Sequence, residues 1–325
     1  MTLYDIPAPA KINLFLHVVG RRDDGYHLLQ TLFRFVDLRD TLHIETRADG
    51  RIARSTELPG VPPDQDLVVR AARALQAATG TALGAQIAVD KRIPAGGGLG
   101  GGSSDAASTL IALNRLWKTG LTRQALMRLA LPLGADVPVF VFGQSAFAQG
   151  VGEQLAAVAL RPRAYLIVQP QAAVPTAGVF AAPELTRDTK LVKIADFSDL
   201  LETKAVDKAR KPGAPGDGCA GPAGTLPAFF GRNDLEPVVF GRYPPVRQAA
   251  RWLADQGVAV RMSGSGACLF GEFAGLPEAL FAQSEIAAKM RLAQSKSQTQ
   301  GSCPIAQVFA CDGLDEHPLR HWIDK

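Results

Sequence analysis

The sequence lacks the features that mark several large classes of protein. Only four cysteines are spread over 325 residues, and none stands in a CxxC pair, so we expect reduced thiols and no disulfide framework. No apolar run approaches the roughly 20 residues that a membrane-spanning helix needs. The opening MTLYDIPAPAKINLF also has no charged region followed by an apolar run. These absences predict a cytoplasmic protein with no membrane partner.

Metal-binding and nucleic-acid-binding patterns are scarce as well. The five histidines form no HExxH motif, and His317 and His321 are separated by Pro318, so we expect no metal site at the histidines. The net charge is +4, without a concentrated basic block. Nucleic-acid binding predicts basic clusters interleaved with aromatic residues. The one basic cluster has no aromatic residues and consists of Lys204, Lys208, Arg210 and Lys211. We therefore expect no nucleic-acid partner, and the sequence leaves the oligomeric state open.

Hydrophobic patterns predict a mixture of strands and helices. Alternating apolar residues over 11–19 predict a strand, in which Lys11 and Asn13 share the face opposite the core. The DDG sequence at 23–25 predicts a turn. The order has no steady strand–helix rhythm, so we predict an α+β fold. Further strands are expected at 41–45, 86–91, 165–170, within 259–273 and at 306–311, and helices at 66–80, 103–120, 246–256 and 276–290.

The stretch PAGGGLGGGSSDAASTL, at 94–110, is the most unusual part of the chain. Six of the seven residues at 96–102 are glycine, each of which destabilises regular structure by about 0.5–1 kcal/mol relative to alanine. The loop joins a predicted strand to a predicted helix, whose N-terminus offers free N–H groups and partial positive charge. Ser103 and Ser104 add hydroxyls at the expected helix cap. The pattern therefore predicts a phosphate-binding loop, with a flexible hinge as the alternative.

Two common phosphate-binding motifs do not fit this loop. A Walker loop requires lysine where Gly102 stands. The dinucleotide fingerprint GxGxxG is matched trivially by any run of glycines. It also requires a strand directly before the loop, which Pro94 interrupts, and an acidic residue about 20 positions later, where Leu121 and Thr122 stand. We therefore exclude both a Walker-type and a Rossmann-type nucleotide site.

The loop instead resembles the ATP-binding motif of the GHMP kinase superfamily. MSGSGACLFG at 262–271 is similar to the C-terminal glycine-rich motif of that superfamily. The opening APAKINLFLHVVGRRDDGYH and the later GADVPVFVFG resemble two further motifs, so the resemblance rests on four motifs in the right order and extends over most of the chain. The resemblance implies a two-domain fold of α+β halves, which we place at 1–157 and 158–325, with the active site in the cleft between them. A Gly/Pro-rich loop at 203–227, interpreted as a mobile surface loop, and a polar segment at 295–302 depart from the pattern.

The resemblance implies ATP as the phosphoryl donor, with Mg²⁺ carried on the ATP, while the sequence leaves open whether side chains ligate Mg²⁺. From the loop we also expect that Gly101→Val abolishes ATP binding while the fold survives, because the loop should lie outside the core. The residues implied in ATP binding are Pro94, Ala95, Gly96, Gly97, Gly98, Leu99, Gly100, Gly101, Gly102, Ser103 and Ser104.

Phosphoryl transfer to an alcohol needs an acceptor for the hydroxyl proton. Asp136 lies between two apolar stretches and, considered alone, is most simply a helix cap or a turn residue. The resemblance makes it the general base, with Lys11 beside it favouring ionisation of the alcohol. A solvated role is the ordinary alternative for Lys11.

The resemblance also implies a small-molecule substrate that contains a cytidylyl diphosphate. Cytosine offers a flat π-face and a hydrogen-bonding edge, so it needs an aromatic platform and a polar neighbour. The GYH motif and the PTxxxF spacing supply such residues. Those implied in substrate binding are Asn13, Tyr26, His27, Thr176 and Phe180. Asp66 and Lys91 stand near the expected adenine pocket without a firm assignment.

Two further interpretations remain open from the sequence. One is a related kinase of the superfamily that phosphorylates a different small alcohol, with the GYH motif as the discriminating feature. The other is a non-catalytic nucleotide-binding regulatory protein on the same fold. The presence of both Lys11 and Asp136 disfavours the regulatory protein.

Overall fold

A computed structural model describes residues 1–55, 57, 60–202, 230–295 and 303–323. The loop predicted at 203–227 and nearly all of the polar segment at 295–302 lie outside these residues. The strands are β1 (Thr2–Arg21), β2 (His27–Arg47), β3 (Ile52–Arg54), β4 (Gly84–Asp90), β5 (Ala146–Gln149), β6 (Gln154–Ala157), β7 (Ala164–Pro170), β8 (Arg261–Met262), β9 (Leu269–Phe273) and β10 (Ile305–Leu314).

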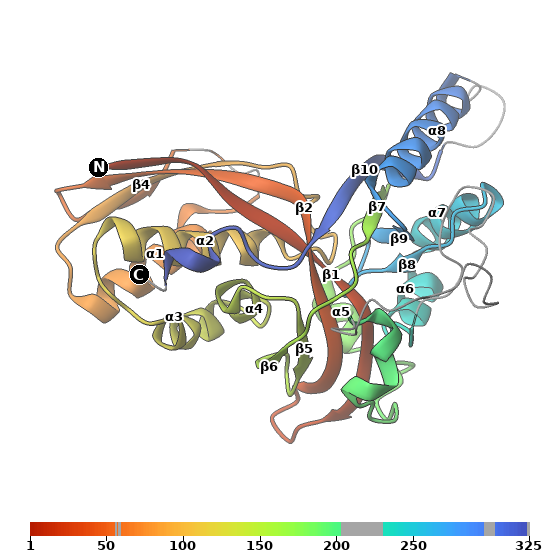
Figure 1. Ribbon diagram of the computed structural model, residues 1–325, viewed down its shortest axis with the longest axis horizontal. Helices are drawn as coiled ribbons and strands as arrows, with labels where there is room; N and C mark the ends of the chain where they lie inside the picture. Colours follow the sequence, from red (N-terminus) through yellow and green to blue (C-terminus); the bar gives the residue numbers. More distant parts are fainter. Residues whose placement is uncertain (56, 58–59, 203–229, 296–302, 324–325) are drawn as a thin grey trace, which may run out of the picture.

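The helices lie against this sheet in two groups (Figure 1), so the predicted α+β class is confirmed. Among the described residues, none of them combines the length and the apolar character needed to cross a bilayer. The α-helices are α1 (Leu67–Thr79), α2 (Gly101–Leu116), α3 (Arg123–Ala130), α4 (Val137–Phe142), α5 (Thr176–Phe180), α6 (Glu236–Arg242), α7 (Pro244–Asp255) and α8 (Leu276–Ser295).

One continuous sheet runs through both groups of helices. Its strand order is β3-β4-β2-β10-β7-β9-β8, with β1 and β5 also paired to β2. β1 and β2 form a long antiparallel pair that passes from the region of α1 and α2 toward α5 (Figure 1). β10 pairs with β2 at one end and with β7 over most of its length. The two halves of the molecule are therefore joined by backbone hydrogen bonds.

β1 is longer than the strand predicted at 11–19, since it pairs with β2 from Thr2 to Arg21. Ile12 and Leu14 are buried in one apolar cluster, and Leu16 lies in a second. The predicted pairing on the other face is observed, since Lys11 Nζ donates to Asn13 Oδ1 over 2.7 Å. Both of these polar side chains are also buried. The alternation thus identified the two faces of the strand, and the polar side chains of the second face are buried.

The helix ends follow local sequence signals in one case and depart from them in another. At α1, Asp66 accepts a hydrogen bond from Val68 N over 3.0 Å, and Gly80 ends the helix in the left-handed conformation, as the sequence predicts. At α2 the predicted cap is wrong. The helix begins earlier, at Gly101, with Gly100 as the N-cap, so Ser103 and Ser104 lie inside the first turn.

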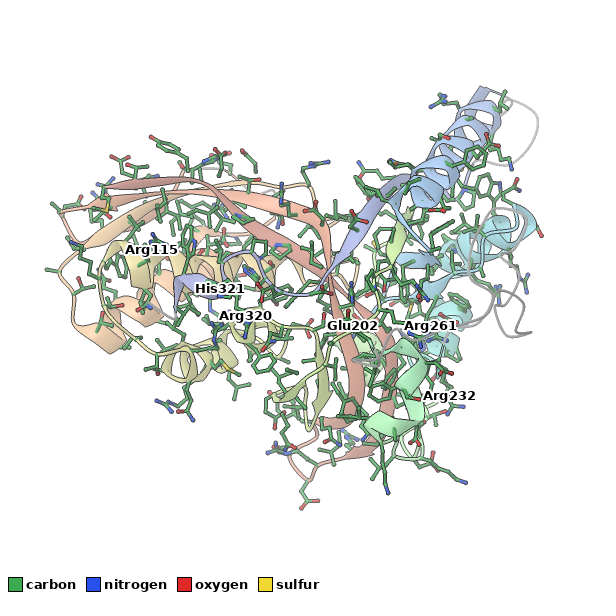
Figure 2. All side chains as sticks on the ribbon, in the orientation of Figure 1. Arg115, Glu202, Arg232, Arg261, Arg320 and His321 are labelled. Atoms are coloured by element: carbon green, nitrogen blue, oxygen red, sulfur yellow. The ribbon has the colours of Figure 1, made fainter. Side chains whose placement is uncertain are left out.

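The C-terminal residues after β10 pack onto the N-terminal half. His317 is buried there, with its Nε2 3.3 Å from Ser108 Oγ of α2. Arg123 Nη2 of α3 donates to Arg320 O over 2.7 Å. Arg115 of α2 has its Cζ 4.7 Å from the centroid of the Trp322 ring, and Figure 2 labels Arg115, Arg320 and His321 in this half of the molecule. The predicted second half, 158–325, therefore contributes its final residues to the packing of the first.

Candidate active site

A cleft of about 920 Å³ opens between the two halves. The glycine-rich loop at 94–102 forms one wall, and the outer face of β1, with Lys11 and Asn13, forms the floor. The second half supplies Thr176 and Ser265. Among the described residues, this cleft brings together most of the side chains that the sequence implicated in binding and catalysis.

The glycine-rich loop packs tightly against residues 262–268 of the other half. Cys268 N donates to Gly97 O over 3.1 Å, and Ser263 Oγ donates to Gly98 O over 3.1 Å. Gly98 has φ +72°, and a Cβ there would lie 3.0 Å from Gly266 N and closer still to Ser263 O. Glycine is required at this position both by the backbone conformation and by the close approach of the second loop.

The reason for expecting that Gly101→Val spares the fold is wrong, because the loop does not lie outside the core, and the survival of the fold stays a prediction. A Cβ at Gly101 would lie 3.1 Å from the Cγ2 of Ile93, which is buried in an apolar cluster, and 3.4 Å from Asp40 Oδ2. The neighbouring Leu99 belongs to the same cluster. The loop is therefore part of the core, and an added side chain would strain that core as well as any ligand contact. Gly102 has more room, since its nearest neighbour would be Leu67 Cδ1 at 3.5 Å.

The beginning of α2 has the properties of an anion-binding site. The helix is 16 residues long, and its N-cap is Gly100, which supplies no side-chain acceptor for the first N–H groups. Ser104 Oγ is buried in this first turn without a hydrogen-bond partner among the described residues. Free N–H groups and the partial positive charge of a helix N-terminus favour phosphate. Residues 94–102 line the cleft, so the beginning of α2 lies at the cleft wall.

Lys11 and Asp136 form an ion pair beside this loop. Lys11 Nζ lies 3.3 Å from Asp136 Oδ2 and also donates to Gly98 O over 3.0 Å. Asp136 occupies the N-cap position of α4, but its side chain makes no capping hydrogen bond. The carboxylate is 38% exposed, whereas the Lys11 side chain is buried. A ligand in the cleft can therefore reach the carboxylate, while the ammonium group stays fixed behind it.

The structure adds residues around Lys11 that the sequence did not reveal. The Phe33 ring of β2 has its centroid 5.4 Å from Lys11 Nζ. Thr31 Oγ1 accepts from Asn13 Nδ2 over 2.8 Å, and Ser263 Oγ accepts from Asn13 N over 3.3 Å. Each contact joins segments far apart in the chain, so no local pattern announces it. Together they hold Lys11 and Asn13 in one orientation.

A second charged cluster lies behind the loop. Lys91 Nζ donates to Asp105 Oδ2 over 2.6 Å and also to the Asp40 carboxylate. Asp40 Oδ1 in turn accepts from the backbone N–H of Arg92 and of Ile93. Burial raises the pKa of Asp105 to about 7, opposed by Lys91 and reinforced by Asp40. Lys91 and Asp66 both line the cleft, and their place in an adenine pocket stays a prediction.

Of the residues proposed to bind the base, Thr176 and Phe180 line the cleft, whereas His27 does not line it and instead contacts Phe180. The rings of His27 and Phe180 have centroids 5.2 Å apart, and Phe180 lines the cleft. Thr176 Oγ1 lies 2.7 Å from Ser265 Oγ. Tyr26 is 64% exposed and does not line the cleft, so the structure does not place it against Phe180.

Comparisons with known proteins agree with this architecture. The family described as GHMP kinases N terminal domain matches residues 66–144, and GHMP kinases C terminal matches residues 218–292. A crystal structure of mevalonate kinase has a TM-score of 0.59 at 13% identity, covering 97% of this chain and 100% of its own, which supports the fold alone.

More similar proteins narrow the assignment. The 4-diphosphocytidyl-2-C-methyl-D-erythritol kinase of Bordetella parapertussis is 65% identical over 324 residues, which cover 99% of each chain. The kinase of the same name from Thiobacillus denitrificans is 52% identical over 319 residues, 98% of each chain. A crystal structure of 4-(cytidine 5'-diphospho)-2C-methyl-D-erythritol kinase has a TM-score of 0.68 at 32% identity, covering 96% of this chain and 99% of its own. The chain therefore belongs to the GHMP kinases, in the family of the 4-diphosphocytidyl-2-C-methyl-D-erythritol kinases.

Proposed function

We propose that this chain transfers the γ-phosphoryl group of ATP to the 2-hydroxyl of 4-diphosphocytidyl-2-C-methyl-D-erythritol. Its place would be in the non-mevalonate route to isoprenoid precursors. The names of its relatives support the substrate. The observation that carries the chemistry is the Lys11–Asp136 ion pair, 3.3 Å across, at the edge of a glycine-rich helix N-terminus.

In this proposal Asp136 accepts the proton of the attacking hydroxyl. Its carboxylate is 38% exposed and makes no helix cap, so one oxygen remains available to a ligand. An aspartate is a weak base for an alcohol. In a loose phosphoryl-transfer transition state the proton leaves late, so a weak base in the right position is sufficient.

Lys11 has two functions in the same step. Its positive charge holds the Asp136 carboxylate 3.3 Å away and stabilises the negative charge that develops on the attacking oxygen. Its contacts with Asn13 and with Gly98 O hold the ammonium group in place before the substrate binds. A donor fixed in advance does not have to reorganise during the reaction, which is the basis of its catalytic effect.

The first turn of α2 suits the phosphates of ATP. Free N–H groups, glycine residues that allow close approach and the unpartnered Ser104 hydroxyl fit an anionic ligand. Mg²⁺ bound to ATP supplies charge neutralisation of the phosphates and prefers oxygen ligands such as hydroxyls and carboxylates. We propose Ser103 and Ser104 as the residues nearest to that ion, with Asp136 completing the oxygen-rich surroundings.

The other end of the cleft suits the cytidylyl group. We propose that Phe180 and Tyr26 stack on the base, that His27 contacts its polar edge, and that Thr176 and Asn13 contact the remainder of the substrate. The His27–Phe180 ring pair supports this assignment, because it combines an aromatic face with a polar edge.

The direct test is incubation with ATP, Mg²⁺ and the cytidylyl substrate, followed by phosphorus NMR of the product. We expect a new phosphomonoester resonance and stoichiometric ADP. The product of Asp136→Asn should form far more slowly while ATP binding persists. ADP formation with a different small alcohol, and none with the cytidylyl substrate, would favour another GHMP kinase activity. ATP binding without transfer to any alcohol would favour the regulatory alternative.

A further inference from the structure

Arg187 lies in the segment after α5 and contacts both sides of the base-binding region. Its Nε donates a hydrogen bond to His27 Nε2 over 3.0 Å. Its Nη2 donates to Phe180 O over 3.2 Å and to Ala182 O over 2.7 Å, and its Nη1 donates to Leu185 O over 2.9 Å. One guanidinium group therefore fixes the end of the helix that carries Phe180 and, at the same time, the ring of His27.

The contact with Arg187 determines the proton position on His27. A guanidinium group has only donors, so Nε2 of His27 must accept, and the single proton of the neutral ring must be on Nδ1. Burial lowers the pKa of His27, and the charges of Arg187 and Arg21 lower it further. The neutral ring with a proton on Nδ1 is thus the form that this environment favours.

The remaining ring nitrogen is available to a ligand. Within the part of the chain that the structure describes, no residue makes a hydrogen bond with His27 Nδ1, and the ring lies 5.2 Å from that of Phe180, centroid to centroid. A base stacked on Phe180 would meet an N–H donor at its edge. Cytosine presents an acceptor at N3, whereas uracil carries a proton there and presents a donor.

We propose that Arg187 is a specificity-determining positioning residue, which fixes His27 as an Nδ1–H donor and so favours cytosine over uracil in the substrate. This inference rests on the proposed function, because it assumes that the base lies beside Phe180. A site built to hydrogen-bond one partner discriminates strongly against an analogue that leaves its donor unpaired. Arg187 does this without touching the reacting atoms.

The test compares Arg187→Met with the matched control Arg242→Met. Arg242 also donates to the α5 region, with its Nη1 3.4 Å from Gly178 O, and pairs with Glu184, but it does not contact His27. For Arg187→Met we expect a KM for the cytidylyl substrate raised about tenfold or more, and kcat within about threefold. The preference for this substrate over its uridine analogue, measured as the ratio of kcat/KM, should fall about tenfold. Arg242→Met should change none of these quantities.

A second readout does not depend on activity. Long-range ¹H–¹⁵N spectra of the free enzyme, labelled at histidine and assigned with His27→Gln, report which ring nitrogen carries the proton. We expect Nδ1–H in the wild type and in Arg242→Met, and a mixture or the Nε2–H form in Arg187→Met. An Nε2–H ring in the wild type, or the same spectrum and base preference in Arg187→Met, would overturn the inference. Equal loss in both arginine variants would reduce Arg187 to a structural support.

The two readouts separate this inference from the proposed function. If the wild type phosphorylates no cytidylyl substrate, the proposed function fails, and the base preference assigned to Arg187 fails with it. If the wild type phosphorylates the substrate but its base preference survives Arg187→Met, only the role of Arg187 fails.

Discussion

The two ends of the cleft differ in how completely they are formed before any ligand binds. At the phosphoryl-transfer end, Lys11 is held by Asn13, Gly98 O and Asp136, and the glycine-rich loop is braced by the opposite half. At the base-binding end, Tyr26 is 64% exposed, and the His27–Phe180 pair forms only one side of a binding site. Preorganised groups reduce the reorganisation needed during the reaction. The comparison indicates that the proposed phosphoryl-transfer end is fixed in advance, whereas the proposed base-binding end has only one side in place.

The largest effect should come from Asp136→Asn, which tests the fixed end directly. The amide has nearly the same shape but cannot accept a proton, so we expect kcat to fall by about 10²–10⁴ while substrate KM changes little. Circular dichroism and ATP titration should match the wild type. A variant with near-normal kcat would show that Asp136 only orients the hydroxyl and that the proton leaves by another route.

A somewhat smaller loss is expected for Lys11→Met, about 10²-fold in kcat, because one fixed donor to the developing charge is removed. The double variant with Asp136→Asn should lose less than the product of the two single losses, since both residues serve one proton transfer. Steady-state kinetics on the wild type, the two single variants and the double variant gives the coupling free energy between Lys11 and Asp136. If the two losses in kcat multiply, Lys11 and Asp136 act independently and do not form one preformed catalytic pair. Thermal unfolding must accompany these measurements, because Lys11 is buried.

The bracing of the loop can be tested by comparing two glycines. Gly98→Ala forces a side chain against the opposite loop in a left-handed backbone conformation, so the free energy of unfolding should fall by about 1–3 kcal/mol. Gly102→Val has room within the fold and lines the cleft. It should change stability by less than about 1 kcal/mol and weaken ATP binding about tenfold. Urea titration and calorimetric ATP titration distinguish the two effects. Equal stability losses would mean that Gly102 is as tightly packed as Gly98.

At the open end, Tyr26→Ala should weaken binding of the cytidylyl substrate by about 1–3 kcal/mol, the usual range for one stacking contact. ATP affinity should hardly change, because Tyr26 lies away from the glycine-rich loop. Isothermal titration of each ligand separately is the measurement. If both ligands weaken equally, Tyr26 supports the fold and the substrate does not close over it.

The smallest effect concerns pH. The pKa of His27 lies below its ordinary value of 6.5, so the ring stays neutral as the pH falls from 8 to 6.5. We therefore expect the KM for the cytidylyl substrate to change by less than about twofold over that range. Because the folded ring has a lower pKa than an unfolded histidine, the contribution of His27 to stability is fully present above about pH 6.5 and is lost as the pH falls from there through the lowered pKa of the folded ring. A KM that rises steeply between pH 8 and 6.5, with unchanged kcat, would indicate a charged ring.

The sequence predicted those parts of the fold and site that local patterns determine. The period of two in β1 placed Lys11 beside Asn13, and the glycine-rich stretch was correctly located between a strand and a helix. The sequence placed the beginning of α2 too late, because glycine is a poor helix former in isolation. In the folded protein the helix already begins at Gly101, where packing against the rest of the molecule outweighs this local preference. Local propensity cannot register such packing.

Contacts between distant segments could not be predicted in this way. Nothing near Asp136 in the sequence indicates that its partner is Lys11, and the resemblance to a family supplied that pairing as an expectation. The Lys91–Asp105 contact and the Arg187–His27 hydrogen bond have no sequence signal, because each joins residues that no local spacing pairs. The individual roles assigned to Tyr26, His27 and the other site residues stay predictions until the variants are measured.

The position of β10 has a consequence for how the protein is made. β10 follows every other strand in the chain, yet it lies in the middle of the sheet, between β2 and β7. A ribosome delivers residues at about 5–20 per second, and N-terminal units generally fold first. Until Ile305–Leu314 leaves the ribosome, β2 and β7 each lack a neighbour and present open backbone edges, which are templates for unwanted pairing. The nascent chain must therefore wait for its late central strand, and translation that stops before Ile305 would leave a sheet open at its centre.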